Sequence, residues 1–143
     1  MLSGEYEHGL DEKGRLILPA KFREILGDRC FITKGYDGCL SVYSAEEWDK
    51  FLQKLILLMA NDKNPNARKV LRTFSSGGVE SSIDKQGRVL IPASLREYAH
   101  ITKDIKIIGV LDKIELWDKQ TWEDYNDAEL SLEDAALALD ELL

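Results

Sequence analysis

The sequence predicts an α+β fold built from two related halves. The first observation is an internal repeat: residues 11–24 (DEKGRLILPAKFRE) reappear without a gap as residues 84–97 (DKQGRVLIPASLRE), with seven of the fourteen positions identical. Unrelated segments of this length share about one identity, so the repeat indicates a duplicated structural unit. The second observation is the pattern around each copy, where short runs typical of strands alternate with Gly-containing turns and capped helices.

Each half is expected to contain a strand, a turn, a strand, a short helix, two further strands joined by a turn, and a longer helix. In the first half the predicted strands are residues 5–10, 15–18, 30–34 and 39–43. In the second half they are residues 79–83, 88–91, 105–111 and 114–117. Residues 11–14 and 84–87 are predicted to be hairpin turns joining the first two strands of each half.

Proline and capping residues mark the expected helices. Two short helices follow or begin at a proline, and they are expected over residues 20–26 and 92–99. Ser44 opens a capping box for a helix that ends near Asn61, and Asn64 caps another that residues 75–78 interrupt. Asp118 is expected to cap the long helix of the second half. The stripes expected to face the core are Trp48, Phe51, Leu52, Leu55 and Met59, and then Ala67, Val70, Leu71 and Phe74.

The chain closes with an expected helix capped by Ser131, whose apolar residues fall on one stripe. They are Leu132, Ala135, Ala136, Leu139, Leu142 and Leu143. A helix with a single apolar face gains its stability by docking, so we expect it to cover its own domain or to pack on a neighbouring subunit.

Composition and motif content exclude several classes of protein. The 143 residues are 44% hydrophobic and 31% charged, which is ordinary for a globular protein. The first residues lack the basic start and apolar core of a secretory signal, and the longest apolar run, 55–60, is too short to span a bilayer. We therefore expect a soluble cytoplasmic protein. Cys30 and Cys39 are interpreted as buried, reduced side chains and not as a disulfide or metal site.

The net charge of −7 argues at first against nucleic acid as a partner. The charge is unevenly distributed, however. Residues 123–143 hold eight acidic residues and no Lys or Arg, which leaves 18 acidic and 19 basic residues in the rest of the chain. The acidity is therefore largely a property of the C-terminal segment, and locally basic surfaces elsewhere remain compatible with the composition.

Three hypotheses compete for the repeated Asp-x-x-Gly-Arg motif. In the first, it is only a stable hairpin, with Asp11 paired to Arg15. In the second, the duplicated arginines Arg15 and Arg88 contact a repetitive polyanion, since arginine suits phosphate and guanine and a β-ribbon fits the major groove. In the third, the carboxylates and arginines line an enzyme site. Duplication favours the second, and no nucleophile–base pair or phosphate-binding glycine loop supports the third.

The two motif copies, together with Gly4–His8, Arg72–Ser75 and Glu115–Trp117, resemble the MraZ family over essentially the whole chain. The resemblance implies a bacterial transcriptional regulator. It implies two tandem AbrB-like (SpoVT-AbrB, swapped-hairpin) halves that form a pseudo-twofold β-barrel core with flanking helices. It also implies subunits assembled into a ring, which binds short repeated boxes upstream of its own operon, the division and cell-wall gene cluster.

The family's Asp-x-x-x-Arg motifs are held to contact DNA, and this role carries over to the matching positions here. The residues expected to bind DNA are Arg15, Lys13, Arg88, Lys85 and Lys21, and those expected to shape the turns are Asp11, Gly14, Asp84 and Gly87. The second copy has Lys85-Gln86 where the first has Glu12-Lys13, and Ser94 where the first has Lys21. The first copy is therefore expected to contribute more to DNA affinity.

Three segments are expected: a first AbrB-like half with two helices (1–76), a second half (77–125) and an acidic C-terminal helix (126–143). The expected partners are double-stranded DNA and further copies of the chain in a ring, in the cytoplasm and at the nucleoid. We expect no enzymatic activity, cofactor, metal, membrane or small-molecule substrate. The alternative is an AbrB-like interaction module, antitoxin-like or scaffolding, whose hairpins serve oligomerisation and not DNA binding.

Overall fold

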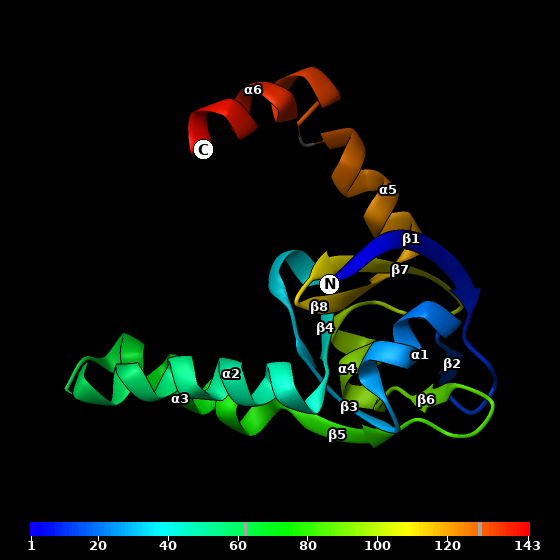
Figure 1. Cartoon of the computed structure of the whole chain (residues 1–143), viewed down its shortest axis with the longest axis horizontal. Helices are drawn as coiled ribbons and strands as arrows, with labels where there is room; N and C mark the ends of the chain where they lie inside the picture. Colours follow the sequence, from blue (N-terminus) through cyan, green and yellow to red (C-terminus); the bar gives the residue numbers. More distant parts are fainter. Residues whose placement is uncertain (62, 129) are drawn as a thin grey trace.

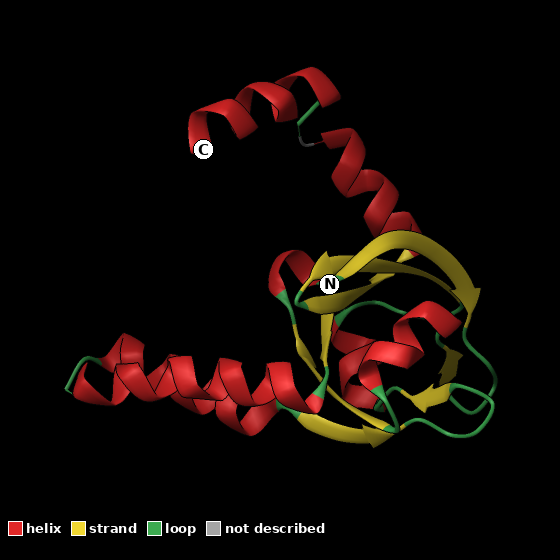
Figure 2. Cartoon of the chain, in the orientation of Figure 1, coloured by secondary structure: helices red, strands yellow, loops and turns green. Residues whose placement is uncertain are grey.

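The strands of this α+β protein form two antiparallel sheets with helices around them (Figures 1 and 2). The structure, a computed structural model, describes residues 1–61, 63–128 and 130–143. Six strands pair in the order β1-β7-β8-β4-β3-β5, and β2 pairs with β6 in a separate two-stranded ribbon. The strands are β1 (Leu2–Gly9), β2 (Arg15–Ile17), β3 (Arg29–Lys34), β4 (Leu40–Tyr43), β5 (Val79–Ser82), β6 (Arg88–Leu90), β7 (Asp104–Leu111) and β8 (Lys113–Asp118).

The strands pair across the two halves. β1 of the first half pairs with β7 of the second, and β5 of the second half pairs with β3 of the first. The two predicted turns are present, but the prediction that they join paired strands was wrong apart from one isolated antiparallel bridge between Ile83 and Val89. A hydrogen bond from the Asp11 N–H to the Arg15 carbonyl (2.9 Å) still closes the first loop, but the flanking strands continue into different sheets. Local sequence cannot choose between these partners, because both copies carry the same apolar pattern.

The expected β-barrel also differs from what the structure contains. β1 and β5 lie at the two edges of the larger sheet, and no strand ladder among the described residues joins this sheet and the ribbon into one closed barrel. The central strands β4 and β8 pair through Leu40–Leu116, Ser41–Glu115 and Val42–Ile114. All four residues of β4 are buried, as expected for a strand covered on both faces.

The hydrophobic core lies between the two sheets and the short helices. Leu16 of β2 and Val89 of β6 point inward and are fully buried. The short helices α1 (Ala20–Leu26) and α4 (Ala93–Tyr98) each follow a proline and add Phe22 and Leu95 to the core. Each copy of the repeat therefore contributes one ribbon strand and one covering helix to the same core.

Two long helical segments project from the larger sheet as a hairpin (Figure 1). They are α2 (Ala45–Ile56), a 3₁₀ turn η2 (Leu57–Asn61) and α3 (Pro65–Gly77). Both predicted caps are present, since the Ser44 side chain accepts from the Glu47 N–H and the Asn64 side chain from the Asn66 N–H. Near the sheet, Trp48 stacks on Phe31 with ring centroids 5.7 Å apart.

The apolar stripes predicted on this hairpin are only partly in the core. Trp48 and Leu55 are buried, whereas Met59 and Val70 are exposed, so their prediction as core residues was wrong. The two helices project away from the sheet (Figure 1), so residues near the far end of the hairpin, such as Met59, lie away from the core. Helix periodicity identifies an apolar face, but it does not show how much of that face other elements bury.

The chain ends in α5 (Lys119–Ala128) and α6 (Leu132–Leu142). Asp118 caps α5 and Ser131 caps α6, as predicted, through bonds of 3.0 and 3.1 Å to the Thr121 and Asp134 N–H groups. The described residues of α6 bury no side chain. In Figure 1, α5 leaves the sheet and α6 lies away from it, so α6 does not cover its own domain.

The two cysteines are reduced and buried, as predicted. Burial raises the pKa of the Cys30 thiol to about 12, which makes it a poor nucleophile at neutral pH. Within the part of the chain that the structure describes, no helix is long and apolar enough to cross a membrane.

We predict that Gly87→Ala destabilises the fold through a contact between the halves. Gly87 has a φ of +80°, and a Cβ there would lie 2.2 Å from Nη1 of Arg23. Alanine would strain the backbone and displace Arg23, so the free energy of unfolding, measured by urea denaturation, should fall by about 1–2 kcal/mol or more.

Gly38→Ala is the matched control, because Gly38 has a φ of +84° and no heavy atom within 4 Å of its added Cβ. It carries the backbone strain alone and should cost less. Equal losses in the two variants would mean that the contact between Arg23 and Gly87 contributes nothing.

Candidate functional site

The first loop of the repeat is held together by the Asp11 carboxylate. Oδ1 accepts from the N–H groups of Lys13 (2.9 Å) and Arg15 (2.8 Å), while Oδ2 accepts from Nε of Arg15 at 2.8 Å. Gly14 closes the turn with a φ of +80°, a conformation that costs glycine little. One carboxylate therefore fixes both the loop backbone and the direction of the guanidinium group.

The second loop repeats this geometry. Asp84 Oδ1 accepts from the N–H groups of Gln86 (3.0 Å) and Arg88 (2.8 Å), and Oδ2 accepts from Nε of Arg88 at 2.7 Å. Gly87 has the same φ as Gly14, +80°. The Asp–Arg pairing considered from the sequence is thus present in both copies, and no described residue accepts from the Nη nitrogens of either arginine. Those nitrogens remain available for an external acceptor.

Hydrogen bonding sets the charge state of the two carboxylates. The pKa values of Asp11 and Asp84 lie below the ordinary value of 3.8, chiefly because the backbone N–H of Arg15 or Arg88 donates to the ionised form. The guanidinium groups lower the pKa values further. Both carboxylates are therefore ionised at neutral pH, and each orients an arginine without burying it.

The ribbon brings the two arginines together on one outward face. β2 and β6 pair antiparallel, with Arg15 opposite Leu90 and Arg88 opposite Ile17. These four residues share the face opposite to the buried Leu16 and Val89, because side chains alternate along a strand. Arg15 and Arg88 are diagonal neighbours whose Cα atoms are about 7–8 Å apart. The two motifs therefore form one surface and not two separate hairpin tips.

The sequence did not point to Ile17 and Leu90 as surface residues. Their side chains are 41% and 51% exposed, on the same ribbon face as the two arginines. They were interpreted only as apolar strand residues. The sequence offers no periodic signal here, because residues 16–18 (LIL) and 89–91 (VLI) are apolar at every position, and only the structure separates the inward from the outward side chains.

The sequence also left Arg23 and Arg96 without a role. Each repeats the same position after the proline, and each lies against the loop of the other half: Arg96 against Gly14 and Arg23 against Gly87. Nε of Arg96 donates to the Ile91 carbonyl at 3.0 Å, whereas Nε of Arg23 is buried without an acceptor among the described residues. The arginine of each copy therefore packs against the loop of the other copy.

The predicted lysines are all exposed. Lys13 lies within the first loop, where its backbone N–H binds Asp11, and Lys85 precedes the equivalent position of the second loop, which Gln86 occupies. Lys21 lies in the first turn of α1 and not on the ribbon. Of these lysines, Lys13 is linked most directly to a motif arginine, because its backbone N–H donates to the same Asp11 carboxylate that binds Arg15.

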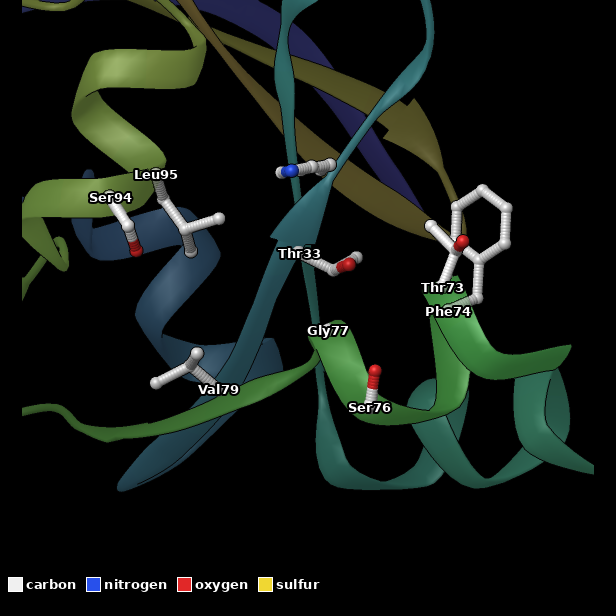
Figure 3. A pocket seen from close by; sticks show the side chains of 9 residues that line it. Thr33, Thr73, Phe74, Ser76, Gly77, Val79, Ser94 and Leu95 are labelled. Atoms are coloured by element: carbon white, nitrogen blue, oxygen red, sulfur yellow. The ribbon is translucent and has the colours of Figure 1, made fainter. Parts of the chain in front are cut away.

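Figure 3 shows a pocket of about 480 Å³ between β3, α3 and α4. Hydroxyl and apolar side chains line it, including those of Thr33, Ser76 and Leu95, and its one charged lining residue is Lys34. The Lys34 ammonium lies 5.1 Å from the centre of the Tyr98 ring. This lining contains no acid–base pair or nucleophile with a base, and the described residues contain no cluster of three or more potential metal ligands. The ribbon face is the stronger candidate site.

Comparison with known proteins places the sequence of this chain in a family. A family model described as "MraZ protein" and, provisionally, as antitoxin-like matches residues 1–73 and again 74–141. The chain belongs to the MraZ family. The doubled match agrees with the duplication read from the sequence, and it contains one Asp–Arg loop in each part.

The alignments with similar MraZ proteins cover nearly the whole chain. The chain is 54% identical over 143 residues to a protein of Thermoanaerobacter pseudethanolicus, covering 99% of both. It is 50% identical over 142 residues to a protein of Clostridium tetani, again covering 99% of both. Both relatives are named "Transcriptional regulator MraZ".

We predict that the two loops contribute to acid sensitivity. A carboxyl whose pKa is lowered by folding stabilises the folded state fully above its unfolded pKa, and this contribution is lost as the pH falls through 3.8 toward the lower folded value. In the Asp11→Asn/Asp84→Asn variant, the drop in stability below pH 4 should therefore be shallower than in the parent chain. Urea denaturation at several pH values between about 3 and 7 measures it.

The Glu46→Gln variant is a suitable control, because Glu46 is exposed and only one of two acids beside Lys50. Its stability should follow the pH dependence of the parent chain. A double loop variant with an unchanged acid profile would contradict the hydrogen-bonded role of the two carboxylates.

Proposed function

We propose that this protein is a DNA-binding transcriptional regulator that uses the outward face of the β2–β6 ribbon. The observation that carries the proposal is the pair of arginines on that face, each held at Nε by its own aspartate with its Nη nitrogens unoccupied. Arginine in this state offers a preoriented fork to phosphate or guanine. The names of the MraZ relatives support the regulatory role.

The proposed target is double-stranded DNA, read in the major groove. A two-stranded antiparallel ribbon has a width that this groove admits, and its outward residues face the base edges. Arg15 and Arg88 would then contact guanine or phosphate, and the exposed Ile17 and Leu90 suit the methyl group of thymine. Lys13, Lys85 and Lys21 would add phosphate contacts around the ribbon.

The proposed assembly is a ring in which many ribbons bind repeated boxes upstream of the division and cell-wall gene cluster. One chain presents few basic side chains, so binding through a single ribbon is expected to be weak. Several linked ribbons on repeated boxes raise the overall affinity by about 10²–10⁴ without new contacts. The acidic segment 123–143 would lie away from the DNA and limit binding to other sequences.

We further propose that the two halves form a pseudo-twofold unit around the ribbon. Exchanging β1 with β5, β3 with β7, β4 with β8 and β2 with β6 leaves the pairing order unchanged, which supports this arrangement. The two arginine loops would then approach the groove in equivalent orientations. The additional basic charge of the first copy, Lys13 and Lys21, would make its contribution larger.

The alternative is a protein-binding or oligomerisation role for the same face. The exposed Ile17 and Leu90 favour it, because exposed apolar pairs also suit protein contacts. A gel shift with the DNA upstream of the chain's own gene separates the two functions. A specific shift supports DNA binding, and no shift at low salt together with an intact oligomer supports the alternative.

We predict that Arg15→Ala weakens binding to a single DNA box by about 1–3 kcal/mol and that Arg88→Ala weakens it less. Both arginines are partly exposed, so the fold should be retained. Arg15→Lys keeps the charge but removes the fork, and it should lie between the parent chain and Arg15→Ala. Fluorescence anisotropy with a labelled duplex measures the dissociation constants.

Lys50→Ala is the control, because Lys50 is an exposed lysine on the projecting hairpin whose partners are Glu46 and Glu47. It should bind DNA like the parent chain. If Arg15→Ala and Lys50→Ala bind equally well, the ribbon face does not contact DNA.

We also predict that affinity depends on the number of boxes and on salt. A duplex with several boxes should bind at least about a hundredfold more tightly than a single box, through avidity. The logarithm of the binding constant should fall linearly with the logarithm of salt concentration, and the slope should be steeper for the array. A single box bound as tightly as an array would refute the role of the ring.

A further inference from the structure

Helix α6 has an apolar face that the rest of the described chain leaves exposed. Leu132 is 87% exposed, and Leu139 and Leu142 of the same stripe are also exposed. The helix has 11 residues, a length at which an isolated helix in water has marginal stability. Its exposed apolar stripe is therefore suited to docking on a surface outside its own domain.

A second uncovered apolar surface lies at the far end of the α2–α3 hairpin. Leu57 is 73% exposed, and Ile56 and Met59 beside it are also exposed. The hairpin extends past the sheet, so these residues lie far from the core (Figure 1). Exposed apolar residues grouped at one end of a projecting element are typical of an interaction site.

The two surfaces carry opposite charge. Residues 120–143 contain eight acidic residues and no Lys or Arg, a formal charge of −8. Residues 53–69, at the far end of the hairpin, contain four basic residues (Lys54, Lys63, Arg68 and Lys69) and one acidic residue (Asp62), a formal charge of +3. Charge complementarity around an apolar contact selects its partner and its orientation.

We propose that α6 of one copy packs its leucine stripe on the end of the α2–α3 hairpin of a second copy of this chain. The proposal specifies the contact between subunits and rests on the homo-oligomer put forward above. The contact joins two different surfaces, so every chain has one donor helix and one acceptor hairpin. Such a head-to-tail contact generates a closed ring when the rotation between subunits closes.

This contact gives the acidic segment a role in assembly. The second half of the chain ends in a helix that does not fold back along α5, whereas α3 of the first half folds back along α2, with Phe74 packed edge-on against Phe51 at 5.8 Å. The stripe of α6 is thus left for another molecule. The ribbon face lies on other elements, so assembly and DNA binding use separate surfaces.

The test breaks one surface at a time and then mixes the variants. The tail variant is Leu132→Asp/Leu139→Asp, and the hairpin variant is Leu57→Asp/Met59→Asp. All four positions are exposed, so each chain should fold with its core intact. Sedimentation velocity should give an oligomer for the parent chain and a 16.2 kDa monomer for each variant alone. An equimolar mixture retains one intact tail and one intact hairpin, so it should give a 1:1 dimer of twice that mass.

The matched control is Leu111→Asn, because Leu111 is a similarly exposed leucine outside both surfaces. Its φ of +65° is one that asparagine adopts readily. This variant should assemble like the parent chain. A monomeric control would overturn the proposal, since it would show that the loss of assembly is not specific to the two surfaces.

The remaining outcomes separate this contact from the proposed function. If the parent chain is oligomeric and either double variant stays assembled, the contact is wrong and the homo-oligomer stands. If both variants are monomers but their mixture forms no dimer, the head-to-tail contact is overturned. A monomeric parent chain overturns both this contact and the proposed ring, while binding of a single DNA box still tests the ribbon independently.

Discussion

The pairing of β2 with β6 is the contact on which the rest of the structure depends. It joins the two copies of the repeat to each other, with Leu16 and Val89 buried on the inner face. The loop that precedes each ribbon strand also accepts a backbone hydrogen bond from the other copy. The Leu18 N–H donates to the Gly87 carbonyl at 2.9 Å, and the Ile91 N–H donates to the Gly14 carbonyl at 3.0 Å. Neither loop could hold this position within a single half.

This dependence links stability to the candidate site. Arg15 and Arg88 share a face because their strands are neighbours, and Asp11 and Asp84 aim them because each loop is closed at its base. Exposed ion pairs of this kind add little stability, so their main contribution is orientation. Arg23 and Arg96 pack against the glycines of the opposite loops, so each loop also has a neighbour from the other half.

Much of the local structure could be predicted from the sequence. The short helices after Pro19 and Pro92, the caps at Ser44 and Asn64 and the turns at Gly14 and Gly87 agree with the structure, because each depends on residues a few positions apart. The Asp–Arg pairs join residues four positions apart, so they could also be predicted from the sequence. The exposure of Met59 could not be predicted from the sequence, because it depends on where the sheet ends.

The sequence by itself determined that there are two copies of one unit, with an aspartate, a glycine and an arginine at fixed spacing in each, and that the acidic charge lies at the C-terminal end. Only the tertiary structure decided that the copies pair with each other, which converts two predicted hairpin tips into one face and puts Ile17 and Leu90 on it. The physical reason is that residues 16–18 and 89–91 are apolar at every position, so the sequence specifies neither which side of each strand is buried nor which strand lies beside it.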